Sequence, residues 1–142
     1  MILGSYPSIF DASGSTLCSR LAYGPMAERL LEPAGGIVQV ELPPGAYQHV
    51  AIVAKPDHPR LLFALGARRR ASEAWDNASR RLRLAVEGVE GARIRFTVYS
   101  PAGAKSLVNA RGENVPFEWS AASGLVRFEA VFVPGDRFEL QF

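Results

Sequence analysis

From Ile37 to Phe142 the chain is a series of short runs in which apolar and polar side chains alternate. This alternation is the pattern of a β-strand with one buried face, because successive side chains point to opposite sides of the backbone. Turns rich in glycine and proline separate the runs at intervals of roughly 8–12 residues, which is typical of a sandwich or barrel. The sequence therefore predicts an all-β fold, an antiparallel β-sandwich of about nine short strands.

The alternation also predicts where the strands lie and how two of them pair. The expected strands cover residues 37–42, 47–54, 60–65, 81–87, 93–99, 105–110, 115–119, 125–133 and 137–142. The runs 81–87 and 93–99 are separated by a short glycine-containing turn, and each has a wholly apolar side. We expect these two strands to form a hairpin whose outer face carries arginine and glutamate.

Two turns and one break in the alternation complete the expected layout. Pro44 and Gly45 predict a turn, because proline fixes φ and glycine adopts a positive φ. Residues 67–79 do not alternate, so we expect them to lie outside the strands, with a helical turn over 67–75. Asp76 predicts a tight turn at the end of this stretch, because its side chain can bond to nearby backbone amides.

Residues 1–36 lack the alternation and are interrupted repeatedly by glycine and proline. We expect an irregular N-terminal segment that packs on the sandwich and contains at most one short helix, over residues 25–32. Pro25 would occupy the first turn of that helix, where its missing N–H is tolerated. The predicted organisation is thus residues 1–36 as this segment and residues 37–142 as the sandwich domain.

Composition excludes several classes of protein. A chain of 142 residues can bury a self-supporting core. With 48% hydrophobic and 21% charged residues, it is not intrinsically disordered. The net charge of +2 is too small to indicate a nucleic-acid or membrane partner. Arginines cluster at 68–70 and at Arg80, Arg81 and Arg83, and we interpret these clusters as a solvated loop and the outer face of a strand.

The N-terminal residues bear on localisation. The stretch Met1-Ile-Leu-Gly-Ser-Tyr-Pro lacks the basic region and the long apolar region of a signal peptide. No run approaches the roughly 18 apolar residues that cross a bilayer. With Met1 as the natural start, we expect a soluble, cytoplasmic protein.

No recognisable catalytic motif occurs in the sequence, and we expect no catalytic residues, no metal ligands and no cofactor. The single cysteine, Cys18, excludes an internal disulfide, and neither His49 nor His58 lies in a known nucleophile signature. Asp57 beside His58 is the best candidate pair for acid–base or metal chemistry. In its proline-bounded turn we interpret it as a turn carboxylate and an exposed imidazole. The other carboxylates fall in turns or at outward strand positions, where solvent makes them poor general acids.

The aromatic residues divide by their phase in the alternation. We expect the inward phase to be core, namely Phe96, Phe117, Phe128, Phe132, Phe138, Phe142 and, in the same phase, Trp119. Trp75, Tyr47 and Tyr99 lie at loops or strand ends. Sugar-binding modules present flat rings on an open surface, so Trp75 and Tyr99 are our candidate carbohydrate platform. The alternative, which we favour, is that Trp75 packs over a sheet edge.

Three stretches carry a resemblance to a known family. They are Leu42-Pro-Pro-Gly-Ala-Tyr-Gln-His-Val-Ala-Ile-Val-Ala, then the run from Leu82 to Pro101, and then Val115-Pro-Phe-Glu-Trp-Ser-Ala-Ala-Ser-Gly-Leu-Val-Arg-Phe. Together they resemble strands and turns of the C-terminal β-sandwich domain of α-galactosidase and raffinose-synthase-type glycoside hydrolases. The resemblance covers about residues 37–142 and rests on strand and turn pattern.

This resemblance implies a function without implying a site. In that family a (β/α)₈ barrel holds the catalytic carboxylates and the sandwich packs behind it, so no catalytic residue carries over to this chain. The implied function is a non-catalytic accessory domain of a carbohydrate-active enzyme, with a catalytic barrel or another protein surface as its partner. Two alternatives stay open: an independent carbohydrate-binding module and a structural or protein-interaction sandwich. In neither case do we expect a nucleic-acid or membrane partner.

Overall fold

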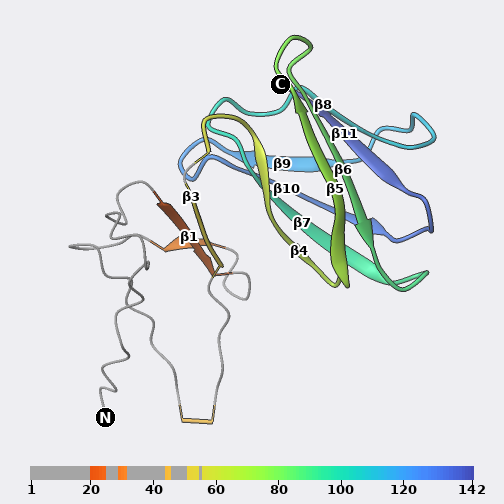
Figure 1. Ribbon diagram of the computed structural model, residues 1–142, viewed down its shortest axis with the longest axis horizontal. Coiled ribbons are helices and arrows are strands. Elements are labelled where there is room, and N and C mark those ends of the chain that lie inside the picture. The colour runs from red at the N-terminus through yellow and green to blue at the C-terminus, as the bar shows by residue number, and fades with distance from the viewer. Residues whose placement is uncertain (1–19, 25–28, 32–43, 46–50, 55) are drawn as a thin grey trace. The chain divides into compact units, whose positions relative to one another are not determined.

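The computed structural model describes residues 20–24, 29–31, 44–45, 51–54 and 56–142 (Figure 1). The chain divides into two compact units, Met1–Lys55 and Pro56–Phe142. This boundary lies in the proline-bounded turn that precedes Arg60, whereas the sequence pattern had placed the start of the sandwich domain at residue 37. We describe each unit by itself.

The first unit contains a small antiparallel sheet. Its strands are β1 (Arg20–Gly24), β2 (Arg29–Leu31) and β3 (Ala51–Ala54), in the order β2-β1-β3. The expected helix over 25–32 is wrong for Arg29–Leu31, which form a strand paired with β1. A helix of two turns is marginally stable by itself, whereas pairing with β1 gives the backbone groups of this strand hydrogen-bond partners. The expected strand 37–42 lies outside the described residues. The turn at Pro44 and Gly45 is confirmed, with Gly45 at φ 76°.

The second unit is an antiparallel β-sandwich of two four-stranded sheets. Sheet I has the order β4-β7-β10-β9, from Arg60–Leu65, Arg93–Tyr99, Leu125–Val131 and Phe117–Ser120. Sheet II has the order β5-β6-β11-β8, from Arg69–Asp76, Arg81–Glu87, Arg137–Gln141 and Ser106–Asn109. The described residues contain no helix, so the all-β prediction is confirmed. It follows that no helix among them is long and apolar enough to cross a membrane.

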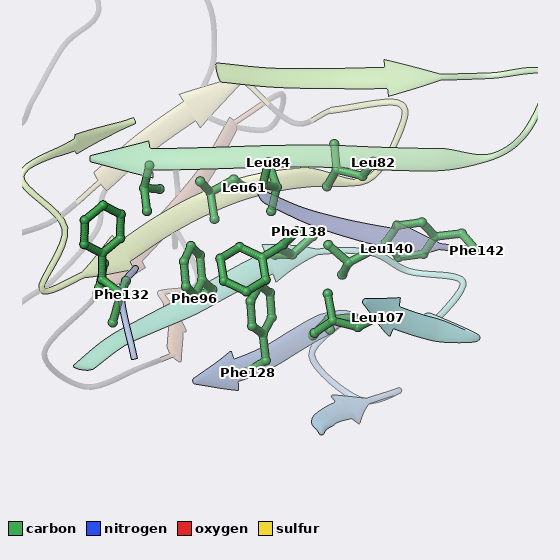
Figure 2. Close-up of a cluster of buried hydrophobic side chains, with 14 residues drawn as sticks. Leu61, Leu82, Leu84, Phe96, Leu107, Phe128, Phe132, Phe138, Leu140 and Phe142 are labelled. Carbon is green, nitrogen blue, oxygen red and sulfur yellow. The ribbon is translucent and has the colours of Figure 1, made fainter. Parts of the chain in front are cut away.

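The core lies between the two sheets and is built from the inward phase of each strand (Figure 2). Phe96 and Phe128, on neighbouring strands of sheet I, stack with ring centroids 4.4 Å apart. Phe138 of sheet II tilts against both rings, at 5.0 and 5.4 Å. These three phenylalanines are at most 4% exposed, so they join the two layers at the centre of the unit.

The strand alternation was predicted correctly, but one pairing was not. β6 lies in sheet II and β7 in sheet I, so the expected hairpin of 81–87 with 93–99 is wrong. Residues 88–92 instead carry the chain across the sandwich, and we call them the arch. Two strands with apolar inner faces look the same in sequence whether they lie side by side or face each other across a core.

A second correction concerns residues 67–79, which were expected outside the strands with a helical turn over 67–75. They contain β5, an edge strand of sheet II. Its register with β6 shifts between Arg70 and Ser72, which leaves Ala71 as the extra residue of a β-bulge. Polar side chains also take inward positions on this strand. Together the bulge and these polar residues remove the alternation that would have indicated a strand.

Candidate functional site

The two residues proposed as a carbohydrate platform lie on different sheets. Tyr99, on β7, is only 9% exposed, so its ring offers no open face to solvent. Trp75, on the edge strand β5, is half-buried against the core. Its ring stacks on His58 with centroids 5.8 Å apart and contacts the ring of Phe142 at 5.9 Å. The structure thus places Trp75 over the sheet edge, and Tyr47 lies outside the described residues.

The Asp57–His58 pair is present as a local contact. Nδ1 of His58 lies 2.6 Å from Oδ1 of Asp57, whose side chain is 95% exposed. The hydrogen bond to His58 is the main reason that the pKa of Asp57 lies below its ordinary value. The carboxylate therefore stays ionised at neutral pH and orients the imidazole, whose ring rests on Trp75. Within the described residues, no three His, Cys, Asp or Glu side chains come together as a metal site, and Cys18 and His49 fall outside them.

The outer face of each sheet carries paired charges, and Arg81 and Arg83 lie on an outer face as expected. On sheet II, Glu139 bridges these two arginines at 3.1 and 2.9 Å. On sheet I, Glu129 bridges Arg93 and Arg95 at 2.7 and 3.2 Å. The hydrogen bond from Arg93 is the main cause that lowers the pKa of Glu129. An ionised, arginine-bound carboxylate has no proton to donate, so Glu129 is not suited to general-acid chemistry.

A polar pair closes the edge of the sandwich between β4 and β5. Glu73 Oε1 accepts a hydrogen bond from the Leu61 backbone N–H at 2.8 Å, and Arg70 Nη2 donates to the Leu61 carbonyl at 2.7 Å. Arg70 and Glu73 also pair with each other at 2.5 Å. The two side chains thereby satisfy both backbone groups of Leu61, which would otherwise lie free at a sheet edge.

The opposite edge strands, β8 and β9, are covered in another way. The segment after β8 turns back on it, with Val115 N–H donating to Leu107 O at 2.9 Å and Asn109 N–H donating to Glu113 O at 3.0 Å. On β9, the expectation that Trp119 is core is wrong, since the residue is 42% exposed. Trp119 has the inward phase, but β9 is an edge strand of sheet I, so one side of the residue is open to solvent. Its indole Nε1–H donates to Ser100 O at 3.2 Å.

Exposed apolar side chains gather at one end of the sandwich. This end, which we call the arch end, is formed by the arch and by the turns at 66–68 and 132–136. Backbone hydrogen bonds join these links, including Gly91 N–H to Phe132 O and Phe132 N–H to Ala92 O. Of the five exposed large hydrophobic residues in the described part, Val89 at 51% and Val133 at 41% lie in these links. Leu65 at 36% and Val131 at 55% are the last residues of β4 and β10, next to the links, and we count them with the arch end. The fifth is Trp119.

Beside these side chains lies an open cleft of about 410 Å³. Its floor includes Ala71, the bulged residue of β5, and Ala85 on the outer face of β6. Arg68 and Arg137 stand in its walls, together with the carboxylates Glu87 and Asp136. Sequence reasoning missed the cleft, because its residues come from three separate segments. The sequence feature that came nearest to indicating the cleft was the loss of apolar–polar alternation around Ala71.

No model of a known protein family and no curated protein matches the chain. The surfaces that bear on function are the apolar side chains at the arch end, the cleft near them, and the exposed residue Trp119.

Proposed function

We propose that this protein is a non-catalytic β-sandwich accessory module that packs against another protein through the arch end. The observation that carries the proposal is the gathering of Leu65, Val89, Val131 and Val133 at that end. Their exposure ranges from 36% to 55%, and Leu65 and Val131 lie on the outer face of sheet I opposite Arg95 and Arg93, which are bridged by Glu129. An exposed apolar cluster rimmed by charges is typical of a surface that meets a partner.

The size of the cluster fits the centre of an interface. Fully burying one valine or leucine side chain is worth about 1.5–3 kcal/mol, so four partly exposed ones contribute a useful share of a binding free energy. A stable interface buries about 800 Å² on each partner, which is more than these side chains alone offer. The polar residues around the arch end would form the rim of the contact.

The partner that we propose is the catalytic barrel of a carbohydrate-active enzyme of the α-galactosidase type. Support for this identity comes from the strand and turn resemblance of the sequence to the sandwich domains that accompany such barrels. Its stretch 115–128 lies in the sandwich, whereas Ala51–Ala54 form β3 of the first unit and the run 82–101 spans both sheets through the arch. In this arrangement the sandwich stabilises or flanks the barrel and contributes no catalytic group.

Site-directed photo-crosslinking in the cells that make the protein tests the proposal. A photoreactive phenylalanine analogue at Val131 should give one discrete adduct, and mass spectrometry should identify it as a protein that contains a catalytic barrel. The matched control is the same analogue at Ala74, which is exposed on β5. An absence of adducts from Val131, or equal adducts from both positions, contradicts docking through the arch end. A discrete adduct with a protein that has no barrel contradicts the enzyme-appendage role and favours the structural alternative.

One observation favours carbohydrate binding as a second candidate function. The Trp119 ring is 42% exposed, and a Cβ atom at Gly103 would lie 3.0 Å from its ring carbons, so the indole rests on the backbone there. A ring fixed in this way resembles the platforms on which sugars stack. Titration with soluble oligosaccharides should then quench the fluorescence of the Trp75→Phe variant and leave that of Trp119→Phe unchanged. Equal responses, or none across neutral oligosaccharides, contradict this candidate.

A further inference from the structure

We propose that the cleft beside the arch end binds a small organic anion, a carboxylate or phosphate monoester with an apolar body. The cleft extends over the outer face of sheet II and shares Arg68, Gly88 and part of the turn 132–136 with the arch end, so it is tested on the chain without a partner. The inference rests on three features of the cleft: an apolar floor, two arginines with no ion pair among the described residues, and a volume of about 410 Å³. Small-molecule sites typically have volumes of about 300–1,000 Å³ and place a few polar groups on an apolar lining.

The floor of the cleft is low and apolar because two alanines lie side by side at the bulge. Ala85 faces outward on β6 between longer neighbours, and the register shift adds Ala71 beside it on β5. Gly88 also lines the cleft, and a Cβ atom at this position would lie 3.1–3.4 Å from side-chain atoms of the core residues Ile94 and Phe132. Phe132, a core residue that is 7% exposed, and Pro134 also line the cleft and add to its apolar lining.

The charge of the cleft favours an anion. Arg69, which lies outside the lining, holds Glu87 through two hydrogen bonds of 2.6 and 2.8 Å. This pair neutralises one of the two carboxylates in the walls and leaves Asp136 as the other. Neither Arg68 nor Arg137 is within ion-pair distance of a carboxylate among the described residues. Two arginines thus face one unpaired carboxylate, and a bound anion would complete the balance.

The arginines are also held by their backbones. Arg68 N–H donates to Glu87 O at 2.7 Å, and Arg137 pairs with Ala85 in the β11–β6 ladder. The two Cα positions are therefore fixed on opposite sides of Ala85 and Glu87. A ligand gains affinity when its charged partners need no backbone rearrangement, because less entropy is lost on binding.

Nuclear magnetic resonance titration of the full ¹⁵N-labelled chain tests the site with three probes: benzoate, phenyl phosphate and neutral benzyl alcohol. We expect saturable shifts of the Gly88 and Gly135 amides with the two anions, at a Kd of about 1 mM, and no saturable shift with benzyl alcohol. Tighter binding of phenyl phosphate identifies a phosphate ligand, and tighter binding of benzoate identifies a carboxylate. Saturation by the alcohol at the same Kd overturns the proposal.

Variants separate the site from general surface charge. The double change Arg68→Gln, Arg137→Gln should weaken anion binding about tenfold or more, whereas Arg80→Gln, which removes one positive charge outside the cleft, should leave it unchanged. Ala85→Leu keeps both arginines and fills the floor, so it should abolish binding even if the double variant folds poorly. Wild-type affinity in Ala85→Leu, or equal losses in Arg80→Gln, overturns the proposal.

Discussion

The two edges of the sandwich are closed by different chemistry. At the β4/β5 edge, the charged side chains of Arg70 and Glu73 bind the backbone of Leu61. At the β8/β9 edge, backbone hydrogen bonds from the segment after β8 cover one strand, and the Trp119 indole lies beside the other. The comparison teaches that a free strand edge needs partners for its backbone groups, and that side chains or main chain can supply them. Closure by side chains depends on single residues and is therefore easier to break.

Glu73→Ala should have the largest effect on this comparison. It leaves the Leu61 N–H without its acceptor and Arg70 without its carboxylate, so we expect a loss of about 3 kcal/mol in the free energy of unfolding. Urea denaturation measures it. The exposed Glu118→Ala on β9 is the control and should change stability by less than about 0.5 kcal/mol. Equal losses in the two variants would show that the β4/β5 edge does not depend on its charged pair.

At the other edge, Gly103→Ala should cost about 2 kcal/mol. Gly103 has φ 75°, which costs an alanine about 1 kcal/mol, and the added Cβ would lie 3.0 Å from the Trp119 ring. Gly112→Ala is the matched control, because its φ is 76° and nothing lies within 4 Å of the new Cβ. Thermal unfolding of both variants isolates the contact with Trp119. If the two lose the same stability, the indole does not pack on the 103 backbone as described.

Trp119→Ala should have a smaller effect, about 1 kcal/mol, because the ring is already 42% exposed. The same change combined with Gly103→Ala should cost less than the sum of the two, since the clash disappears with the ring. A double-mutant cycle from urea denaturation measures this coupling. Strict additivity would indicate that Trp119 and Gly103 do not interact.

Acid sensitivity should show the smallest effect, and it separates the outer faces from the edges. The pKa values of Glu87 and Glu129 are lowered chiefly by hydrogen bonds from Arg69 and Arg93. A carboxylate with a lowered pKa in the folded state stabilises it above the unfolded pKa, about 4.3 for glutamate, and this contribution is lost as the pH falls through the folded value. Glu87→Gln with Glu129→Gln should therefore flatten stability against pH below about 5. An unchanged slope in an acid titration followed by circular dichroism would contradict this.

Much of the sandwich could be predicted from period-two alternation. The run 60–65 was assigned with the bounds that β4 has, and the strands at 81–87 and 93–99 likewise match β6 and β7. Alternation reports which face of a strand is buried, so it found the core phenylalanines. It carries no information on which strand is the neighbour, and the pairing of β6 with β7 was therefore wrong.

The candidate sites were harder to predict because they depend on departures from the pattern. Arg70 and Glu73 take inward positions, where a polar residue suggests that there is no strand at all. Trp119 has the inward phase but lies on the edge strand β9, so a prediction from phase alone assigned it to the core. The cleft needs a bulge at Ala71, and a bulge is visible only once the two strands are paired.

The position of β11 in sheet II has a consequence for synthesis of the protein. β11 lies between β6 and β8, and the side chain of Arg81 reaches Gln141, 60 positions further on. Until the ribosome has released Arg137–Gln141, β6 and β8 each have one strand edge whose backbone groups lack their partner, β11. A nascent chain would carry these two strand edges unpaired during that interval, which exposes it to aggregation.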